Sequence, residues 1–217
     1  MKNFKKISNF ILFVLTIYIV TSISEWFIHK YIMHSNYLNN YDYSNHIRHH
    51  NDVNYNMSLS NKVEDDLYFS FTYTVEVLLL IFPLYYIIIN KVFKYKKSLT
   101  FIFMLSLTIT ILYVLSWNYL HPLFHMISEV PFDKWTSLEK ILFRNHAYHH
   151  LQKGDKKGNY CIVFLGADHL FGTYNNCINN KEYCEKNYHN LSKETKELYN
   201  MEKQNKKLKY GLKFYGQ

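Results

Sequence analysis

The stretch that decides the fold is residues 99–120, LTFIFMLSLTITILYVLSWNYL, which holds no charged side chain in 22 positions. About 20 apolar residues span a bilayer as a helix, because a helix bonds its own backbone polar groups. Residues 7–24, ISNFILFVLTIYIVTSIS, have no charge in 18 positions, and residues 67–90 form a further apolar segment that contains Glu76 and Pro83. We therefore expect an all-α integral membrane protein with three membrane helices, or four if Pro83 splits residues 67–90 into a hairpin.

The composition favours one membrane-embedded domain, which we place at residues 1–175, followed by a polar tail at 176–217. The chain of 217 residues is 48% hydrophobic and holds only 6 Gly and 3 Pro, which excludes collagen-like and Pro/Gly-rich disordered proteins. Three cysteines are too few for a disulfide-stapled scaffold, so we expect reduced thiols. No A-x-A-like cleavage site follows the apolar residues 7–24, so we expect them to be a retained membrane anchor rather than a signal peptide.

About half of the net charge of +8 lies at the C-terminal end, where residues 181–217 hold nine Lys and five Glu. A positive balance suits nucleic acids or an anionic membrane surface. The tail lacks the interleaving of Arg and aromatic residues that is typical of nucleic-acid grooves. We therefore expect a membrane environment and no nucleic-acid partner.

Histidine is the most unusual feature of the sequence, because ten of the twelve histidines fall into four clusters. Two clusters have the pattern His-x-x-His-His, and two such triplets in one chain are very rarely expected by chance. On a helix, positions i, i+3 and i+4 share a face, so each triplet is expected to aim three imidazoles at one point. The remaining histidines, His169 and His189, are expected to have no part in the site. The clusters are His29 and His34; His46, His49 and His50; His121 and His125; and His146, His149 and His150.

The spacing within the other two clusters makes more specific predictions. His29 and His34 are five residues apart and diverge by about 140° on a regular helix, so either the helix ends between them or a π-bulge realigns them. His121 and His125 share a face, although Pro122 is expected to end or kink the helix there. An even number of membrane crossings separates the second cluster from the third. All four clusters are therefore expected on one face of the membrane, with residues 136–151 forming a helix that Thr136 and Glu139 begin with a capping box.

Ten imidazoles supply five ligands to each of two metal ions and leave a position on each ion for an exogenous ligand. Imidazole suits iron, zinc, copper and nickel, and a structural zinc site would need only four ligands. The pattern therefore indicates an open, reactive two-metal site. Because all these ligands are neutral, hydroxide or nearby carboxylates must balance the charge. Glu25, one turn before His29, is the first candidate for a carboxylate that supports the ligands.

Eight or more histidines on membrane-embedded helices is a pattern that resembles the fatty acid hydroxylase and sterol desaturase superfamily of di-iron oxygenases. The resemblance covers roughly residues 20–175. The segment Glu25-Trp-Phe-Ile-His29-Lys-Tyr-Ile-Met-His34 is similar to the first motif of fatty acid 2-hydroxylases, and the three-residue gap of the third cluster fits the same group. Asp168-His-Leu-Phe-Gly-Thr173 resembles the segment after the last cluster, where the Asp supports a ligand. Asn118 stands where an Asp is expected three residues before His121.

The resemblance implies that two iron ions, which zinc can replace, use dioxygen to hydroxylate a lipid C–H bond, with 2-hydroxylation of a fatty acyl chain as the main expectation. It also implies a separate cytochrome b-type protein or reductase as electron donor, since the chain has no fused haem domain. The histidine clusters are expected to face the cytosol, in the endoplasmic reticulum membrane if the source is eukaryotic.

Two alternatives stay open. One is a sterol or carotenoid hydroxylase or desaturase of the same superfamily, because the ligands do not encode the substrate and because the His29–His34 segment also resembles bacterial carotenoid hydroxylases. The other is a metal-binding or transport membrane protein without catalysis. Transport is disfavoured because the apolar segments hold no histidine away from one end, whereas a transport path needs ligands along it.

Overall fold

The structure is a computed structural model of the chain that describes residues 2–34, 41–53, 57–59, 68–125, 134–151 and 158–174 and the single positions 189, 196 and 200. Apart from those three positions, the predicted tail at 176–217 lies outside the described residues. Cys177 and Cys184 lie outside them too, and Cys161 is a buried free thiol.

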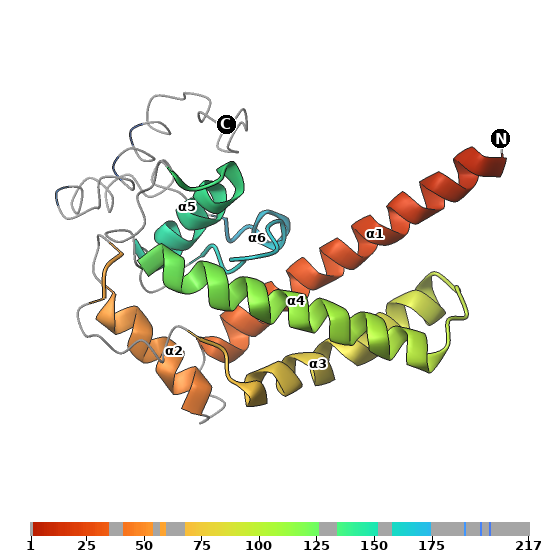
Figure 1. Ribbon diagram of the computed structural model, residues 1–217, viewed down its shortest axis with the longest axis horizontal. Coiled ribbons are helices and arrows are strands. Elements are labelled where there is room, and N and C mark those ends of the chain that lie inside the picture. The colour runs from red at the N-terminus through yellow and green to blue at the C-terminus, as the bar shows by residue number, and fades with distance from the viewer. Residues whose placement is uncertain are drawn as a thin grey trace.

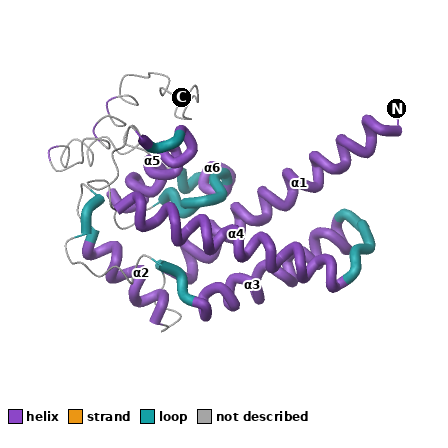
Figure 2. The backbone as a smooth tube through the Cα atoms, viewed as in Figure 1, coloured by secondary structure: helices purple, strands orange, loops and turns teal. Residues whose placement is uncertain are grey.

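Three helices are long and apolar enough to cross a membrane, as the sequence predicts, and this fits an integral membrane protein (Figures 1 and 2). Helix α1, Lys2–Phe27, continues into a π-helical segment, η1, at Ile28–Met33. Helix α3, Phe71–Tyr86, continues into a second π-helical segment, η3, at Ile87–Val92, and α4 covers Leu99–His125. The described residues form no β-sheet beyond one isolated bridge between Val53 and Leu59.

The two prolines inside these helices do not interrupt them. Pro83 lies within α3, so residues 67–90 do not form a hairpin and the described chain has three candidate spans. The prediction that Pro122 ends or kinks α4 is wrong in its first form, because the helix continues to His125. Packing holds this last turn, since Phe124 is fully buried and the His125 ring bonds the Met57 carbonyl.

Helices α3 and α4 pack side by side, and α1 crosses them near the end that bears η1 (Figure 1). Buried aromatic and branched aliphatic side chains recur every four residues on α3, including Tyr73, Val77 and Ile81. The outer surfaces are apolar instead of polar, with large exposed side chains that a lipid environment would cover. They include Phe10, Leu12, Leu15 and Ile19 on α1, Leu79 on α3 and Leu112 and Leu115 on α4.

A polar helical cap lies at the end of the bundle away from the N-terminus and away from the α3–α4 connection (Figure 1). It consists of α2, Tyr41–Asp52, α5, Ser137–Leu151, and the short α6, Ala167–Leu170. The predicted capping box of α5 is confirmed: the Glu139 N–H donates to Thr136 Oγ1 at 3.2 Å, and the Thr136 N–H donates to Glu139 Oε2 at 2.6 Å. The cap brings together all four histidine clusters.

Candidate metal centre

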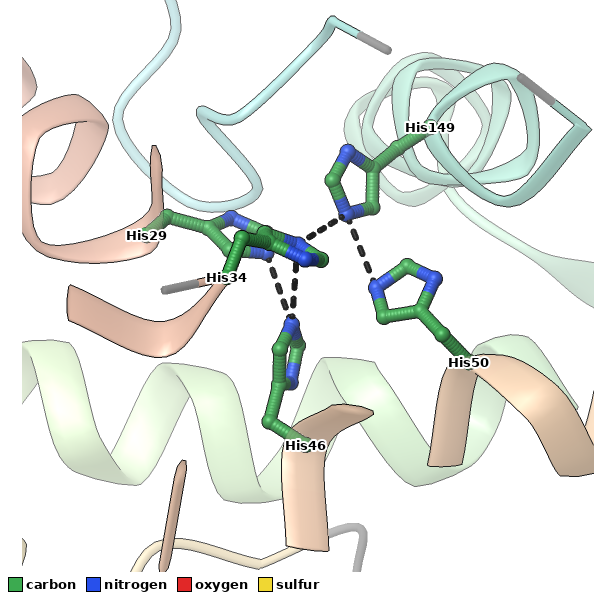
Figure 3. Close-up of side chains that lie close together, drawn as sticks. All are labelled: His29, His34, His46, His50 and His149. Carbon is green, nitrogen blue, oxygen red and sulfur yellow. Dashed lines mark hydrogen bonds between the residues drawn. The ribbon is translucent and has the colours of Figure 1, made fainter. Parts of the chain in front are cut away.

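The ten clustered histidines form two groups of five, each of which could hold a metal ion. Within a group, the possible ligand nitrogens all lie within 4.8 Å of one another. We call them group A and group B; the five side chains of group A are drawn in Figure 3. Neither group includes His169, which stacks on Tyr174, or the exposed His189. Group A is His29, His34, His46, His50 and His149, and group B is His49, His121, His125, His146 and His150.

Each His-x-x-His-His triplet serves both groups, so the prediction that a triplet aims three imidazoles at one point is wrong. In α2, His46 and His50 belong to group A and His49 to group B. In α5 the assignment is reversed, with His146 and His150 in group B and His149 in group A. The reason is angular: residues i and i+4 differ by about 40° around a helix, whereas i+3 and i+4 differ by about 100°. The histidines at i and i+4 therefore face one group, and the histidine at i+3 faces the other group.

The π-helical segment η1 aligns His29 with His34, which is the second of the two alternatives that their spacing predicts. The His34 N–H bonds the His29 carbonyl at 3.2 Å, which is the five-residue bond of a π-helix. The two rings stack with centroids 5.0 Å apart. A regular α-helix would turn these side chains away from each other, so this local departure is what lets α1 supply two imidazoles to group A.

The nitrogen spacing fits a coordination shell. In group A, Nε2 atoms approach one another along the series His29–His46, His46–His34, His34–His149 and His149–His50 at 3.0, 3.2, 3.1 and 3.0 Å. In group B, His146 Nε2 lies 3.0 Å from His125 Nε2 and 3.1 Å from His150 Nε2. Ligands at about 2.1 Å from one ion are about 3.0 Å apart at right angles and about 3.4 Å apart in a tetrahedron. The nitrogen spacings in both groups are therefore compatible with ligands around one ion.

Three of the imidazoles are oriented by backbone carbonyls that bond their outer nitrogen. The Nδ1 atoms of His29, His149 and His125 contact the carbonyl oxygens of Tyr160, Gly158 and Met57 at 2.5, 2.7 and 2.8 Å. A proton on Nδ1 leaves Nε2 with a free lone pair, which is the form that binds a metal. These contacts therefore select the tautomer that aims Nε2 into the groups.

Left-handed residues lie at or next to all three of these carbonyls. Met57 has φ 68° and Asn159, between Gly158 and Tyr160, has φ 57°. Non-glycine residues adopt this conformation at a cost, and Met less readily than Asn. The reversal at Asn159 lets the carbonyls on both of its sides reach histidines of group A. Strain is thus stored where the ligands are positioned.

Two buried carboxylates hold the segment that carries those carbonyls. Glu25, predicted to support a ligand, accepts the N–H groups of residues 162, 163 and 164 at 2.7–2.9 Å. Asp168 accepts the N–H groups of Tyr160 and Cys161 at 2.9 and 2.8 Å. Five consecutive N–H groups, from residue 160 to residue 164, are therefore bound by two carboxylates. Both predicted residues support the site through the backbone rather than by contact with an imidazole.

Asn118, the third predicted supporting residue, serves a different segment. Its side-chain oxygen accepts the Phe69 N–H at 2.8 Å, and its amide nitrogen lies 3.5 Å from the Phe69 carbonyl. It thus anchors the chain that enters α3. The Phe69 ring in turn stacks on Trp117 at 4.3 Å, so the effect of Asn118 on the histidines passes through packing.

Burial keeps the imidazoles neutral. The pKa values of His46, His146 and His150 lie well below the usual value, first because burial disfavours the charged form and then because neighbouring histidines oppose a second positive charge. Neutral imidazole is the ligand form, so no proton needs to be displaced for metal binding at neutral pH. His34 and His50 of group A are only half-buried, whereas all five residues of group B are buried.

Several residues that support the site have no signature in the sequence. Trp117, on α4, contacts both groups, and its ring centroid lies 5.8 Å from that of His29 and 4.8 Å from that of His121. Asn145 donates its side-chain N–H to the Cys161 carbonyl and so ties α5 to the segment held by the two carboxylates. The α-helical spacing of Trp117 and His121 is the only signal that could have linked the tryptophan to the site.

Comparisons with protein-family models, with curated proteins and with solved structures find no match for this chain. Its class therefore rests on the fold and on the histidine groups: a helical protein with three candidate membrane spans and two adjacent histidine-rich sites that could hold metal.

Proposed function

We propose that the protein is a membrane-bound di-iron oxygenase that hydroxylates a lipid C–H bond with dioxygen. The observation that carries this proposal is the pair of five-imidazole groups at one end of three apolar helices. Two redox-active ions, held by the five imidazoles of each group, would supply the activation of dioxygen. Zinc could replace iron, because nitrogen ligands alone do not select iron over zinc.

Ring contacts hold the two histidine groups together and limit the access of water to them. The rings of His50 and His150, one from each group, stack with centroids 4.1 Å apart, so the two groups are in direct contact. Trp117, Phe69 and Tyr73 form a continuous aromatic stack beneath the groups, with successive ring centroids 4.3 and 3.9 Å apart. Exclusion of water from such a site prevents loss of reactive species to side reactions.

A fatty acyl chain is the proposed substrate, and hydroxylation beside its carbonyl is the proposed position of attack. The resemblance of the Glu25–His34 segment to fatty acid 2-hydroxylases supports the position. The apolar surface of the spans supports a substrate that diffuses within the bilayer. The balanced reaction consumes one dioxygen, two electrons and two protons, inserts one oxygen atom into the C–H bond and releases one water. A separate cytochrome b-type protein or reductase would supply the electrons.

The test is oxygen-isotope incorporation by the purified, iron-loaded protein with a fatty acyl lipid, an electron donor and labelled dioxygen. One labelled oxygen atom should enter the lipid next to the carbonyl. His49→Ala should abolish incorporation, and His189→Ala, outside both groups, should not. Label in a sterol or carotenoid would retain the oxygenase and exclude the acyl substrate. An iron-loaded protein that consumes no dioxygen with any of these lipids would support the metal-binding alternative.

We also propose that the histidine end faces the cytosol, in the endoplasmic reticulum membrane if the source is eukaryotic. The exposed residue Ser98 ends the α3–α4 connection, at the opposite end of the bundle (Figure 1). In a background with Cys177 and Cys184 replaced by Ser, a cysteine at position 98 should be shielded from an impermeant thiol reagent on the cytosolic side. A cysteine at the exposed Lys134, beside α5, should react. The opposite pattern would invert the orientation.

A further inference from the structure

We propose that the two groups bind metal with unequal affinity, that group A fills first, and that Asp168 is the positioning residue responsible. The inference deepens the proposed function and rests on its premise that both groups bind metal. It does not depend on the reaction or on the substrate.

The first step of the argument is a relay through a single peptide unit. Asp168 Oδ2 accepts the Cys161 N–H at 2.8 Å. The carbonyl of that same peptide, on Tyr160, receives His29 Nδ1 at 2.5 Å. Hydrogen bonds in series polarise one another, so the carboxylate makes this carbonyl a stronger acceptor. A stronger acceptor at Nδ1 raises the basicity of Nε2, as a direct carboxylate–histidine pair does.

A second relay connects Asp168 to His149, the other carbonyl-anchored ligand of group A. His149 Nδ1 bonds the Gly158 carbonyl, and the N–H of the same peptide, on Asn159, donates to the Thr173 carbonyl at 3.1 Å. The Thr173 hydroxyl donates to Asp168 Oδ1 at 2.7 Å. Two of the five group A ligands are therefore oriented by one carboxylate.

In group B, His125 is anchored by the neutral Met57 carbonyl, and the buried Nδ1 atoms of His146 and His150 have no hydrogen-bond partner within the described residues. The two buried carboxylates of the described part of the chain, Glu25 and Asp168, both bind the segment that orients group A. A divalent ion with only neutral ligands gains most where negative charge lies nearby in a medium of low dielectric constant.

Access to the two groups differs in the same sense. His34 and His50 of group A are half-buried, whereas every histidine of group B is buried. An ion that arrives from solvent therefore meets group A first, so kinetics and affinity favour the same order of loading.

The experiment is a titration of the metal-free, full-length protein in detergent with cobalt(II), followed by calorimetry and by the visible absorption of the bound ion. The wild-type protein should show two steps. Asp168→Asn should weaken the first step by about 10- to 100-fold, which is the usual effect of removing an outer partner of a ligand, and should leave the second step unchanged. Glu139→Gln, in the capping box of α5, is the control for loss of a carboxylate and should affect both steps alike and at most slightly.

Two half-site variants keep the test decisive even if Asp168→Asn fails to fold. His46→Ala and His146→Ala each remove the first histidine of a triplet, one from each group. With His146→Ala the protein should keep the tight step, and with His46→Ala only the weak one. Asp168→Asn should then weaken binding in the His146→Ala background and not in the His46→Ala background. Equal affinity in the two backgrounds would overturn the inference and leave the two-metal proposal intact, whereas a wild-type protein that binds no cobalt would overturn both.

Discussion

Groups A and B are built by the same rule from different parts of the chain. Each consists of two histidine pairs and one single histidine; α2 gives its pair to group A and its single histidine to group B, and α5 does the reverse. The ring centroids repeat closely: His46–His50 and His146–His150 are 4.8 and 4.5 Å apart, and His46–His49 and His146–His149 are 6.1 and 6.2 Å apart. The third contributor distinguishes them, because η1 completes group A and α4 completes group B.

Segment η1 and helix α4 differ in the backbone conformation that their histidine pairs require. His121 and His125 are four residues apart on a regular helix and need no special geometry. His29 and His34 need a π-helical segment, and the carbonyl that orients His29 needs two carboxylates and a left-handed residue nearby. Group A therefore depends on more of the fold than group B does, and the following predictions test this exchange of ligands and this imbalance.

The largest expected effect comes from breaking the exchange itself. His49→Ala should cost mainly the ion of group B, and His149→Ala mainly that of group A, although each residue shares a helix with a pair of the other group. The same-group double variant His49→Ala/His146→Ala should keep one ion per chain. The cross-group double variant His49→Ala/His46→Ala should keep neither.

Elemental analysis of folded, purified protein measures this outcome, with His189→Ala as the control that retains both ions. If the two double variants have the same metal content, the assignment of ligands to groups is wrong. Loss of both ions from each single variant would mean that the centres bind only as a pair.

The general architecture follows from the sequence because its signals are local. Apolar runs predict three spans, or four if Pro83 splits the second, and a five-residue gap predicts either a helix end or a π-bulge between His29 and His34. Thr136 and Glu139 predict the start of α5, since a capping box needs only residues three apart. Each of these features depends on neighbours along the chain; the structure confirms the capping box and selects three spans and the π-helical alternative.

The assembly of the site could not be predicted in the same way. The split of each triplet depends on where two other elements place a neighbouring centre, which helical periodicity does not encode. The carbonyls of Met57, Gly158 and Tyr160 are backbone groups, so no residue type announces them. The sequence predicts that Glu25 and Asp168 support the ligands, but not that they act through the backbone N–H groups of residues 160–164. For Glu25, this action requires a contact between segments 137–139 positions apart in the sequence.

A smaller effect is expected from acid. The pKa values of His46, His146 and His150 are lowered in the folded, metal-free protein, so below the unfolded value of about 6.5 the unfolded chain binds more protons than the folded one. Stability should therefore fall as the pH decreases below about 6.5, by up to about 1.4 kcal/mol per pH unit for each histidine that stays neutral.

Thermal unfolding of the metal-free protein between pH 7.5 and pH 5 measures this loss. His146→Ala should flatten the dependence because it removes one buried base, and so should His46→Ala. A midpoint independent of pH in this range would show that these imidazoles are not held neutral.

The smallest effect should come from the start of α5, and it should not distinguish the two groups. Thr136→Ala removes the hydroxyl that accepts the Glu139 N–H and should cost about 1 kcal/mol of unfolding free energy, a usual value for an N-cap.

Burial alone would raise the pKa of Glu139, but hydrogen bonds from the backbone and side chain of Thr136 and from Tyr119 outweigh it and hold the pKa below its usual value. The stabilisation by the Glu139 carboxylate is therefore present above its unfolded pKa and is lost as the pH falls through the lower, folded value.

Because α5 carries the pair of group B and the single histidine of group A, Thr136→Ala should weaken both steps of a cobalt titration alike and slightly, in contrast to the selective effect expected of Asp168→Asn. A change in only one step would mean that the N-terminus of α5 positions one centre and not the other.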